Sequence, residues 1–88
     1  MLNLNYDSAF DVLYLGFADK SNSYGDEIKN GHVLMIDEDT QTITGLTIFD
    51  FMHRYKNGTL EDLSLPISID YAVDVIPRLH LSASAVAV

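Results

Sequence analysis

The sequence predicts an α+β domain: an antiparallel β-meander of about five strands, one short helix near residues 51–57 and an extended C-terminal segment. Three observations carry this prediction. Short runs of β-forming apolar residues recur up to residue 49, an Asn-Gly dipeptide separates two of them, and apolar residues alternate with polar ones after Leu63. Because 88 residues form one small core, residues 1–88 are expected to be a single domain.

The N-terminal part of the chain predicts two neighbouring strands. Leu2, Leu4 and Tyr6 alternate with asparagine, which is typical of a half-exposed strand. Residues 12–17, VLYLGF, form an almost continuous apolar run, which indicates a central strand covered on both faces. Aspartate and serine residues between the two runs supply turn chemistry.

The Asn30-Gly31 dipeptide is the clearest local signal for a β-hairpin. Asn-Gly adopts positive φ at both central positions of a type I′ turn at little cost. We therefore expect strands at about 23–29 and 32–37, joined by this turn. A polar loop then leads to a further strand at about 43–49.

At Asp50 the pattern changes to helical spacing. Phe51 and Tyr55 lie four residues apart, on one face of a helix expected over residues 51–57. Asp50 is expected to cap this helix by accepting a backbone N–H two or three residues further on. Gly58 is expected to end it in the left-handed conformation.

Residues 57–88 are predicted to be a C-terminal extension that forms strands. Apolar residues fill nearly all odd positions from Leu63 to Ala87, which favours a strand over residues 63–75. Helical spacing around residues 69–76, with Asp70 as the cap, is the alternative.

Two prolines bear on this extension. Pro66 requires an edge position without a donor, and Pro77 is expected to mark a break near Ile76. As one strand, the segment from Leu63 would span roughly 80 Å, whereas a compact chain of this size has a radius of gyration of about 12 Å. We therefore predict a homodimer through the C-terminal segment; the alternative is a tail folded back on its own sheet, with residues 82–88 frayed.

The charge balance restricts the partners. With 13 acidic and 5 basic residues, the net charge is −8, so a nucleic-acid backbone would be repelled and a basic protein is the natural complement. The alternative is that the acidity only keeps the domain soluble. No stretch of 18 apolar residues and no signal-peptide pattern is present, so no membrane association is expected. The lack of cysteine fits a reducing compartment, and a cytoplasmic location is expected.

The most site-like stretch is Asp37-Glu38-Asp39. Counted as an EF-type calcium loop from Asp37, it has Gln41 at position 5, Thr42 where glycine is required and Ile48 where a bidentate glutamate is required. We therefore expect a solvated hairpin loop, with a weak metal-ion or small-molecule contact as the alternative. An acid/base pair is not expected, because an exposed loop does not separate the pKa values of its carboxylates.

The remaining titratable residues form no catalytic pattern. His32, His53 and His80 are far apart in the sequence without metal-ligand spacing, and each is expected at the surface. No nucleophile elbow and no phosphate-binding glycine loop is present. The protein is therefore expected not to be an enzyme, with no catalytic residues, no cofactor-binding residues, no metal ligands and no cofactor.

Three stretches of the chain resemble the bacterial family catalogued as domain of unknown function 2283. They are residues 6–15 (YDSAFDVLYL), residues 31–37 (GHVLMID) and residues 43–50 (ITGLTIFD). Members carry a Tyr-Asp opening, an aspartate ahead of a Leu-Tyr-Ile-like strand, a glycine-led strand ending in acidic residues and a Gly-x-x-Ile-Leu-Asp end. The resemblance covers about residues 4–56, and the chain departs from it at Phe10, where a small residue is usual, and in its longer tail.

This resemblance implies a small antiparallel β domain with one helix and no established activity. Some relatives are paired with small toxin-like proteins, which implies an antitoxin-like binding role. Our first hypothesis is therefore a non-enzymatic protein-interaction module that binds a basic partner. The second is a small-molecule or metal-ion binding protein that uses the Asp37–Asp39 loop, and an enzyme is the third.

Overall fold

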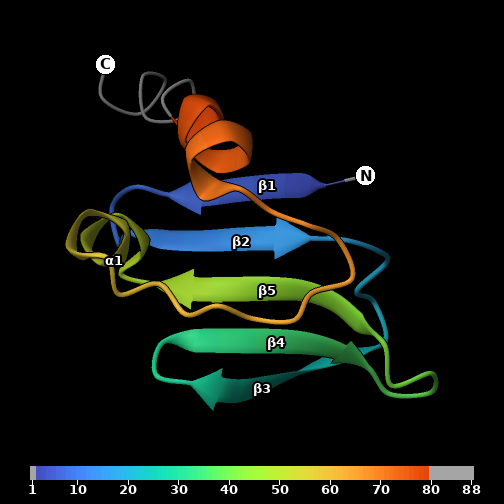
Figure 1. Cartoon of the computed structure of the whole chain (residues 1–88). Coiled ribbons are helices and arrows are strands. Elements are labelled where there is room, and N and C mark those ends of the chain that lie inside the picture. Colours follow the sequence, from blue (N-terminus) through green and yellow to red (C-terminus); the bar gives the residue numbers. More distant parts are fainter. Residues whose placement is uncertain (1, 80–88) are drawn as a thin grey trace.

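The computed structural model describes residues 2–79, which form a five-stranded antiparallel sheet with two short helices (Figure 1). The helices are α1 (Phe51–Asn57) and η1 (Tyr71–Val75), a π-helical turn that continues as α-helix over residues 76–79. The strands are β1 (Asn3–Asp7), β2 (Val12–Gly16), β3 (Ser23–Lys29), β4 (His32–Asp37) and β5 (Ile43–Phe49). The α+β class and the antiparallel five-stranded sheet are confirmed. No helix within residues 2–79 has the length and hydropathy needed to cross a bilayer.

The order of the strands is β1-β2-β5-β4-β3, so the predicted meander is wrong between β2 and β3. After β2 the chain crosses to the far edge, forms β3 and β4, and returns β5 to the side of β2. The two strands richest in buried residues thereby occupy the centre of the sheet. The core consists of Leu13, Leu15, Leu46, Ile48, Phe51, Val75 and Leu79.

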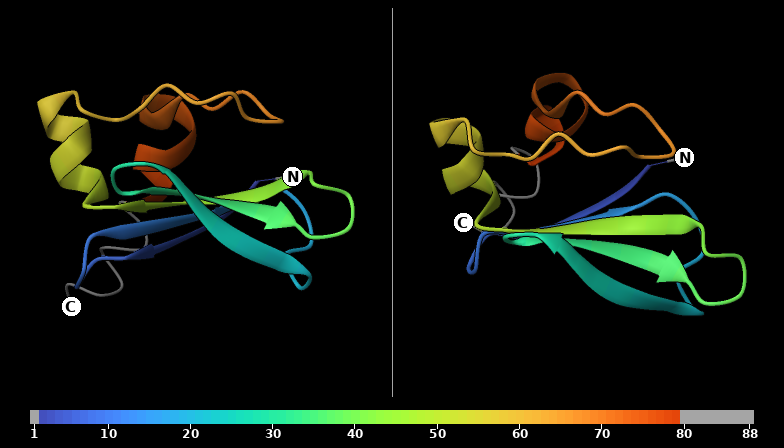
Figure 2. Two further views of the ribbon diagram at one scale, coloured as in Figure 1. Left: turned by 90° about the horizontal axis from the view of Figure 1, so that it is seen from below. Right: turned by 60° about the horizontal axis from the view of Figure 1, so that its bottom comes forward.

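Both helices and the chain between them lie on the same face of the sheet, the covered face (Figure 2). The other face, the open face, carries Tyr14, which pairs with Thr47 and is 38% exposed. The prediction that β2 is covered on both faces is therefore wrong at Tyr14. On the covered face, Leu13 and Leu15 are fully buried beneath the helices.

The β3–β4 hairpin has the predicted strand boundaries but a different turn. Gly31 has a φ of 74°, whereas Asn30 is not among the described residues with positive φ. A type I′ turn requires positive φ at both positions, so this prediction is wrong. The strand register instead shifts between Glu27 and Lys29, and this bulge removes the need for a second left-handed residue.

The N-terminal cap of α1 is Asp11 rather than Asp50. Asp50 is left-handed, with a φ of 56°, and its side chain makes no capping hydrogen bond. The loop between β1 and β2 places Asp11 beneath the helix, where Oδ1 accepts the Met52 N–H at 2.8 Å and Oδ2 accepts the His53 N–H at 3.2 Å. The C-terminal prediction is confirmed, because Gly58 is left-handed and its N–H reaches the last turn.

The strand predicted over residues 63–75 is wrong. Residues 59–70, the strap, cross the covered face without joining the sheet and bend at residues 66–67. The odd-numbered residues from 63 to 69 are half-buried and the even-numbered residues from 64 to 70 are exposed. The alternation therefore indicated extended backbone correctly, but it cannot tell a strap packed on a sheet from a strand paired within one.

The alternative, a helix capped by Asp70, is confirmed. The Asp70 side chain accepts the Ala72 N–H at 3.0 Å, and the helical turns begin at Tyr71. Pro77 does not break this helix but lies within it. The π-helical turn before Pro77 already interrupts the regular i−4 hydrogen-bond ladder that a proline would disturb.

The C-terminal segment therefore packs on its own sheet as far as Leu79, which was the alternative to the dimer. Leu63, Leu65 and Ile69 pack against the core, and Leu79 is 4% exposed. The radius of gyration is 12.9 Å. The expected fraying of residues 82–88 lies outside the described residues, and the homodimer stays a prediction.

Candidate binding site

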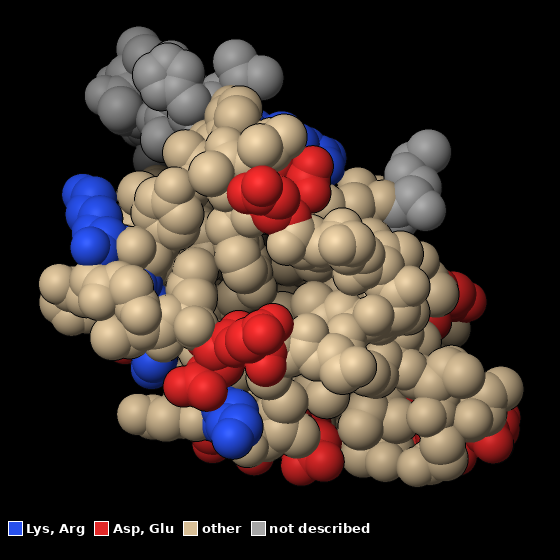
Figure 3. Space-filling model, viewed as in Figure 1, with Lys and Arg blue, Asp and Glu red and all other residues tan. Residues whose placement is uncertain are grey.

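A hollow of about 340 Å³ lies along the strap, between its outgoing and returning arms. Figure 3 shows acidic side chains gathered on this face of the molecule, beside a depression in the surface. The lining comes from the strap and the first residue of η1: Glu61, Asp62, Leu63, Ser64, Leu65, Ile67, Ser68, Ile69 and Tyr71.

The alternating sequence of the strap builds this hollow. In an extended chain, successive side chains point to opposite sides. Leu63 and Leu65 point down and pack against the core, so Ser64 and Ser68 remain on the outer side with exposed hydroxyls. The result is a recess with aliphatic walls and a polar rim.

The start of the strap is held by hydrogen bonds from two of its backbone N–H groups. The Thr59 N–H donates to the Arg54 carbonyl at 2.9 Å, which ties the strap to the end of α1. The Glu61 N–H donates to Nε2 of His32 at 3.3 Å, which ties it to the sheet. These two contacts fix where the Glu61 and Asp62 side chains leave the backbone.

The rim of the hollow is negatively charged. Glu61 and Asp62 are exposed, and within residues 2–79 no hydrogen bond to either carboxylate is found. Tyr71 packs against Phe51, with ring centroids 5.6 Å apart. Burial, followed by the charge of Asp62, raises the pKa of the Tyr71 phenol, so the hydroxyl keeps its proton at neutral pH. The hollow thus offers two carboxylates, two serine hydroxyls and a phenol.

This chemistry suits a cation carried on an aliphatic stem. The carboxylates and hydroxyls complement the charged group, and the leucine and isoleucine walls complement methylene groups. Lysine and arginine side chains have both parts. Within residues 2–79, no group of three His, Asp or Glu side chains is placed to hold a metal ion.

The Asp37–Asp39 loop connects β4 and β5, as the hairpin prediction required. Oδ1 of Asp37 accepts the N–H groups of Asp39 at 2.9 Å and Thr40 at 3.0 Å. The hydrogen bonds from Thr40 and then Asp39 hold the pKa of Asp37 below its usual range. Asn22 donates to Oδ2 of Asp39 at 3.0 Å. These carboxylates therefore stabilise the turn and its contact with the loop before β3.

The histidines differ from one another. His53 is exposed on α1, as predicted, and His80 lies outside the described residues. His32 is fully buried, so the prediction of a surface position is wrong. The signal for burial was present in the sequence, because His32 is two residues from Leu34 and so shares its face of β4.

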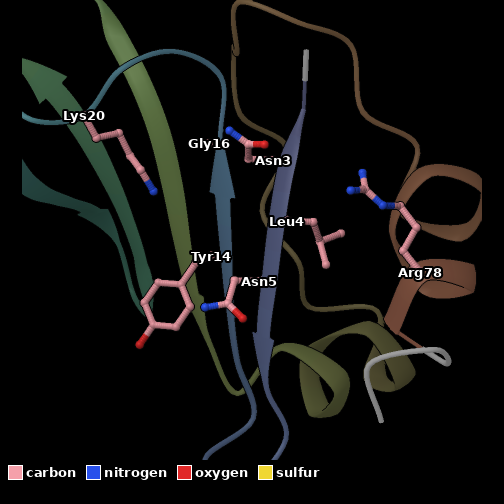
Figure 4. Close-up of a pocket in the computed structure, with 7 residues that line it drawn as sticks. All are labelled: Asn3, Leu4, Asn5, Tyr14, Gly16, Lys20 and Arg78. Carbon is pink, nitrogen blue, oxygen red and sulfur yellow. The ribbon is translucent and has the colours of Figure 1, made fainter. Parts of the chain in front are cut away.

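A second hollow, of about 380 Å³, lies at the edge of β1 and includes Lys20 and Arg78. Figure 4 shows the side chains of Lys20 and Arg78 on opposite sides of β1, with the strand between the two cations. Nη1 of Arg78 donates to the Leu2 carbonyl at 3.4 Å. The arrangement therefore gives no convergent site for an anion.

Comparison of the chain with protein-family models, with curated proteins and with solved structures found no match. The resemblance to the domain of unknown function 2283 family therefore stays a prediction.

Proposed function

We propose that the protein is a non-enzymatic protein-interaction module that binds a basic segment of a partner through the hollow of the strap. The observation that carries this proposal is the pair of exposed carboxylates, Glu61 and Asp62, at the rim of a recess with aliphatic walls. An antitoxin-like role, in which the acidic domain neutralises a basic partner, is one form of this proposal. A cytoplasmic location belongs to it as well.

The energetics favour a basic segment over a single ion. An exposed ion pair contributes only about 0–1 kcal/mol. Burial of each methylene of a lysine or arginine stem adds about 0.8 kcal/mol. One side chain in the hollow therefore binds weakly, and several basic residues along one segment are needed for a stable complex. The net charge of −8 speeds the encounter with such a segment.

The proposal is tested by titrating the ¹⁵N-labelled protein with a capped Gly-Arg-Gly-Arg-Gly peptide. We expect amide shifts at Ser64 and Ser68 that weaken with added salt, and no such shifts with a Gly-Gln-Gly-Gln-Gly peptide. The double variant Glu61→Gln/Asp62→Asn is expected to abolish them, whereas Glu38→Gln, an exposed change outside the strap, leaves them unchanged. Equal shifts with both peptides, or shifts that persist in the double variant, would contradict the proposal.

The same titration with calcium tests the alternative site. Shifts confined to the Asp37–Asp39 loop would favour a metal-ion binding protein. Self-association is a separate expectation. Since the apolar side of the strap is already packed on its own sheet, a homodimer requires a surface other than the apolar side of the strap.

A further inference from the structure

His32 lies where the sheet holds the strap, and its two ring nitrogens have different partners. Nδ1 is 2.9 Å from the carbonyl oxygen of Asn30, and Nε2 is 3.3 Å from the backbone nitrogen of Glu61. A carbonyl oxygen only accepts and a backbone N–H only donates. Nδ1 therefore carries the proton and Nε2 carries none, so the contacts fix one neutral tautomer.

Protonation of His32 is incompatible with its contact to the strap. A proton on Nε2 would face the N–H of Glu61, which leaves two donors opposed and no acceptor between them. Acidification therefore favours the released form.

The charged groups around His32 come from three neighbouring elements. Arg54 of α1 packs over Gly31, the residue before His32, and donates from Nε to the Phe49 carbonyl at 2.8 Å. From β3, Lys29 is the cross-strand partner of His32, and the carboxylate of Glu27 accepts the Gly31 N–H at 3.0 Å. The strap contributes the charge of Glu61. These charged residues belong to the elements that flank His32, and the Glu27 carboxylate is already hydrogen-bonded to the turn.

We propose that His32 is a pH-sensitive latch: its protonation releases the strap at Glu61 and opens the hollow beside it. The part of this inference that concerns binding rests on the proposed function. The release is local, because the apolar residues of the strap and the Thr59 contact with α1 remain in place.

Amide hydrogen exchange tests the latch without any ligand. The exchange rate of the Glu61 amide is measured relative to that of Leu46 in β5, which corrects for the intrinsic effect of pH. Between about pH 8 and pH 5, where histidines change charge, we expect this ratio to rise about tenfold, as for the loss of one hydrogen bond. A ratio that does not change in the wild-type protein would overturn the latch.

A matched pair of variants assigns the effect to His32. His32→Gln retains an oxygen that accepts the Glu61 N–H and cannot be protonated, so its ratio is expected to be independent of pH. His53→Gln removes an exposed histidine of α1 and is expected to behave like the wild type. The same pH dependence in His32→Gln as in the wild type would overturn the proposal. The ¹⁵N shifts of the His32 ring give a test that needs no variant, because at neutral pH they must show the Nδ1–H tautomer.

The arginine peptide separates this inference from the proposed function. Release of the strap at Glu61 frees one of the two rim carboxylates from its fixed position, so binding of the peptide is expected to weaken. Binding that weakens on acidification in the wild type but not in His32→Gln therefore supports the latch. If acidification weakens peptide binding equally in the wild type and in His32→Gln, the latch has no effect on binding. If the peptide binds at no pH, the proposed function fails, and the exchange ratio still decides whether the latch exists.

Discussion

Replacement of Asp11 by alanine is expected to destabilise the protein strongly. The Asp11 carboxylate accepts two backbone N–H groups of α1, and its Oδ1 also accepts the Tyr6 hydroxyl at 2.6 Å. The loss of a helix cap costs about 0.5–2 kcal/mol. The loss of a hydrogen bond to a charged group costs about 1.5–3 kcal/mol. Because both losses involve the same carboxylate, we expect a total of about 2–4 kcal/mol rather than the full sum.

Asp50→Ala is a matched control for this experiment. Asp11 and Asp50 both have a φ of 56°, so alanine introduces the same backbone strain at either position. The Asp50 side chain makes no capping hydrogen bond. The difference between the two variants therefore isolates the hydrogen bonds of Asp11.

Urea denaturation followed by circular dichroism gives both free energies of unfolding. A difference of about 3 kcal/mol corresponds to a gap of roughly 12–24 °C between the melting temperatures of the two variants. A double-mutant cycle with Tyr6→Phe then separates the phenol contact from the cap. Equal destabilisation by Asp11→Ala and Asp50→Ala would refute the assignment of the cap.

Three further predictions concern two left-handed glycines, the response to pH and calcium binding. Gly31→Val is expected to cost at least about 1–3 kcal/mol of stability, because φ is +74° and a Cβ would collide with the Arg54 guanidinium. Gly58→Ala is expected to cost less, because φ is +67° but no atom lies within 4 Å of the added Cβ. Equal losses of stability in thermal melts of the two variants would contradict this. Burial and the hydrogen bond to Asp11 raise the pKa of Tyr6. The stabilising contribution of the protonated phenol is therefore present below about pH 10 and is lost progressively above it. Urea titrations should show that Tyr6→Phe loses less stability at alkaline pH than the wild type. Calorimetry should detect no micromolar calcium affinity, and affinity that vanished in Asp37→Ala would show that the loop is a metal site.

Local sequence patterns predicted the strands of the sheet well, because each of them depends on residues close together in the chain. The boundaries of β3, β4, β5 and α1 agree with the predicted ranges. The order of the strands does not follow from local patterns, because every strand in an antiparallel sheet shows similar alternation. The capping role of Asp11 was missed for the same reason: Asp50 is adjacent to the helix, and only the folded chain brings the β1–β2 loop beneath its first turn.

The sequence did not single out the residues that line the hollow of the strap. Asp37–Asp39 has the highest local density of carboxylates, but the Asp37 carboxylate is used to hold its own turn. Glu61 and Asp62 belong to no motif, and their importance depends on the walls that the strap builds around them. A weak signal was nevertheless available, since serines occupy the outer positions of an alternating segment that follows directly after two carboxylates.

The strap shows why alternation alone does not identify a paired strand. Side-chain burial with a period of two requires only an extended chain against an apolar surface, and the covered face of the sheet supplies that surface. A strand in a sheet also has its backbone hydrogen bonds satisfied by its neighbours, and side-chain identity does not record this. A segment with few backbone hydrogen bonds opens locally at a low cost in free energy. The hydrogen bond between Glu61 and His32 is therefore a larger part of the free energy that holds the strap in place than a single hydrogen bond is for a strand within the sheet.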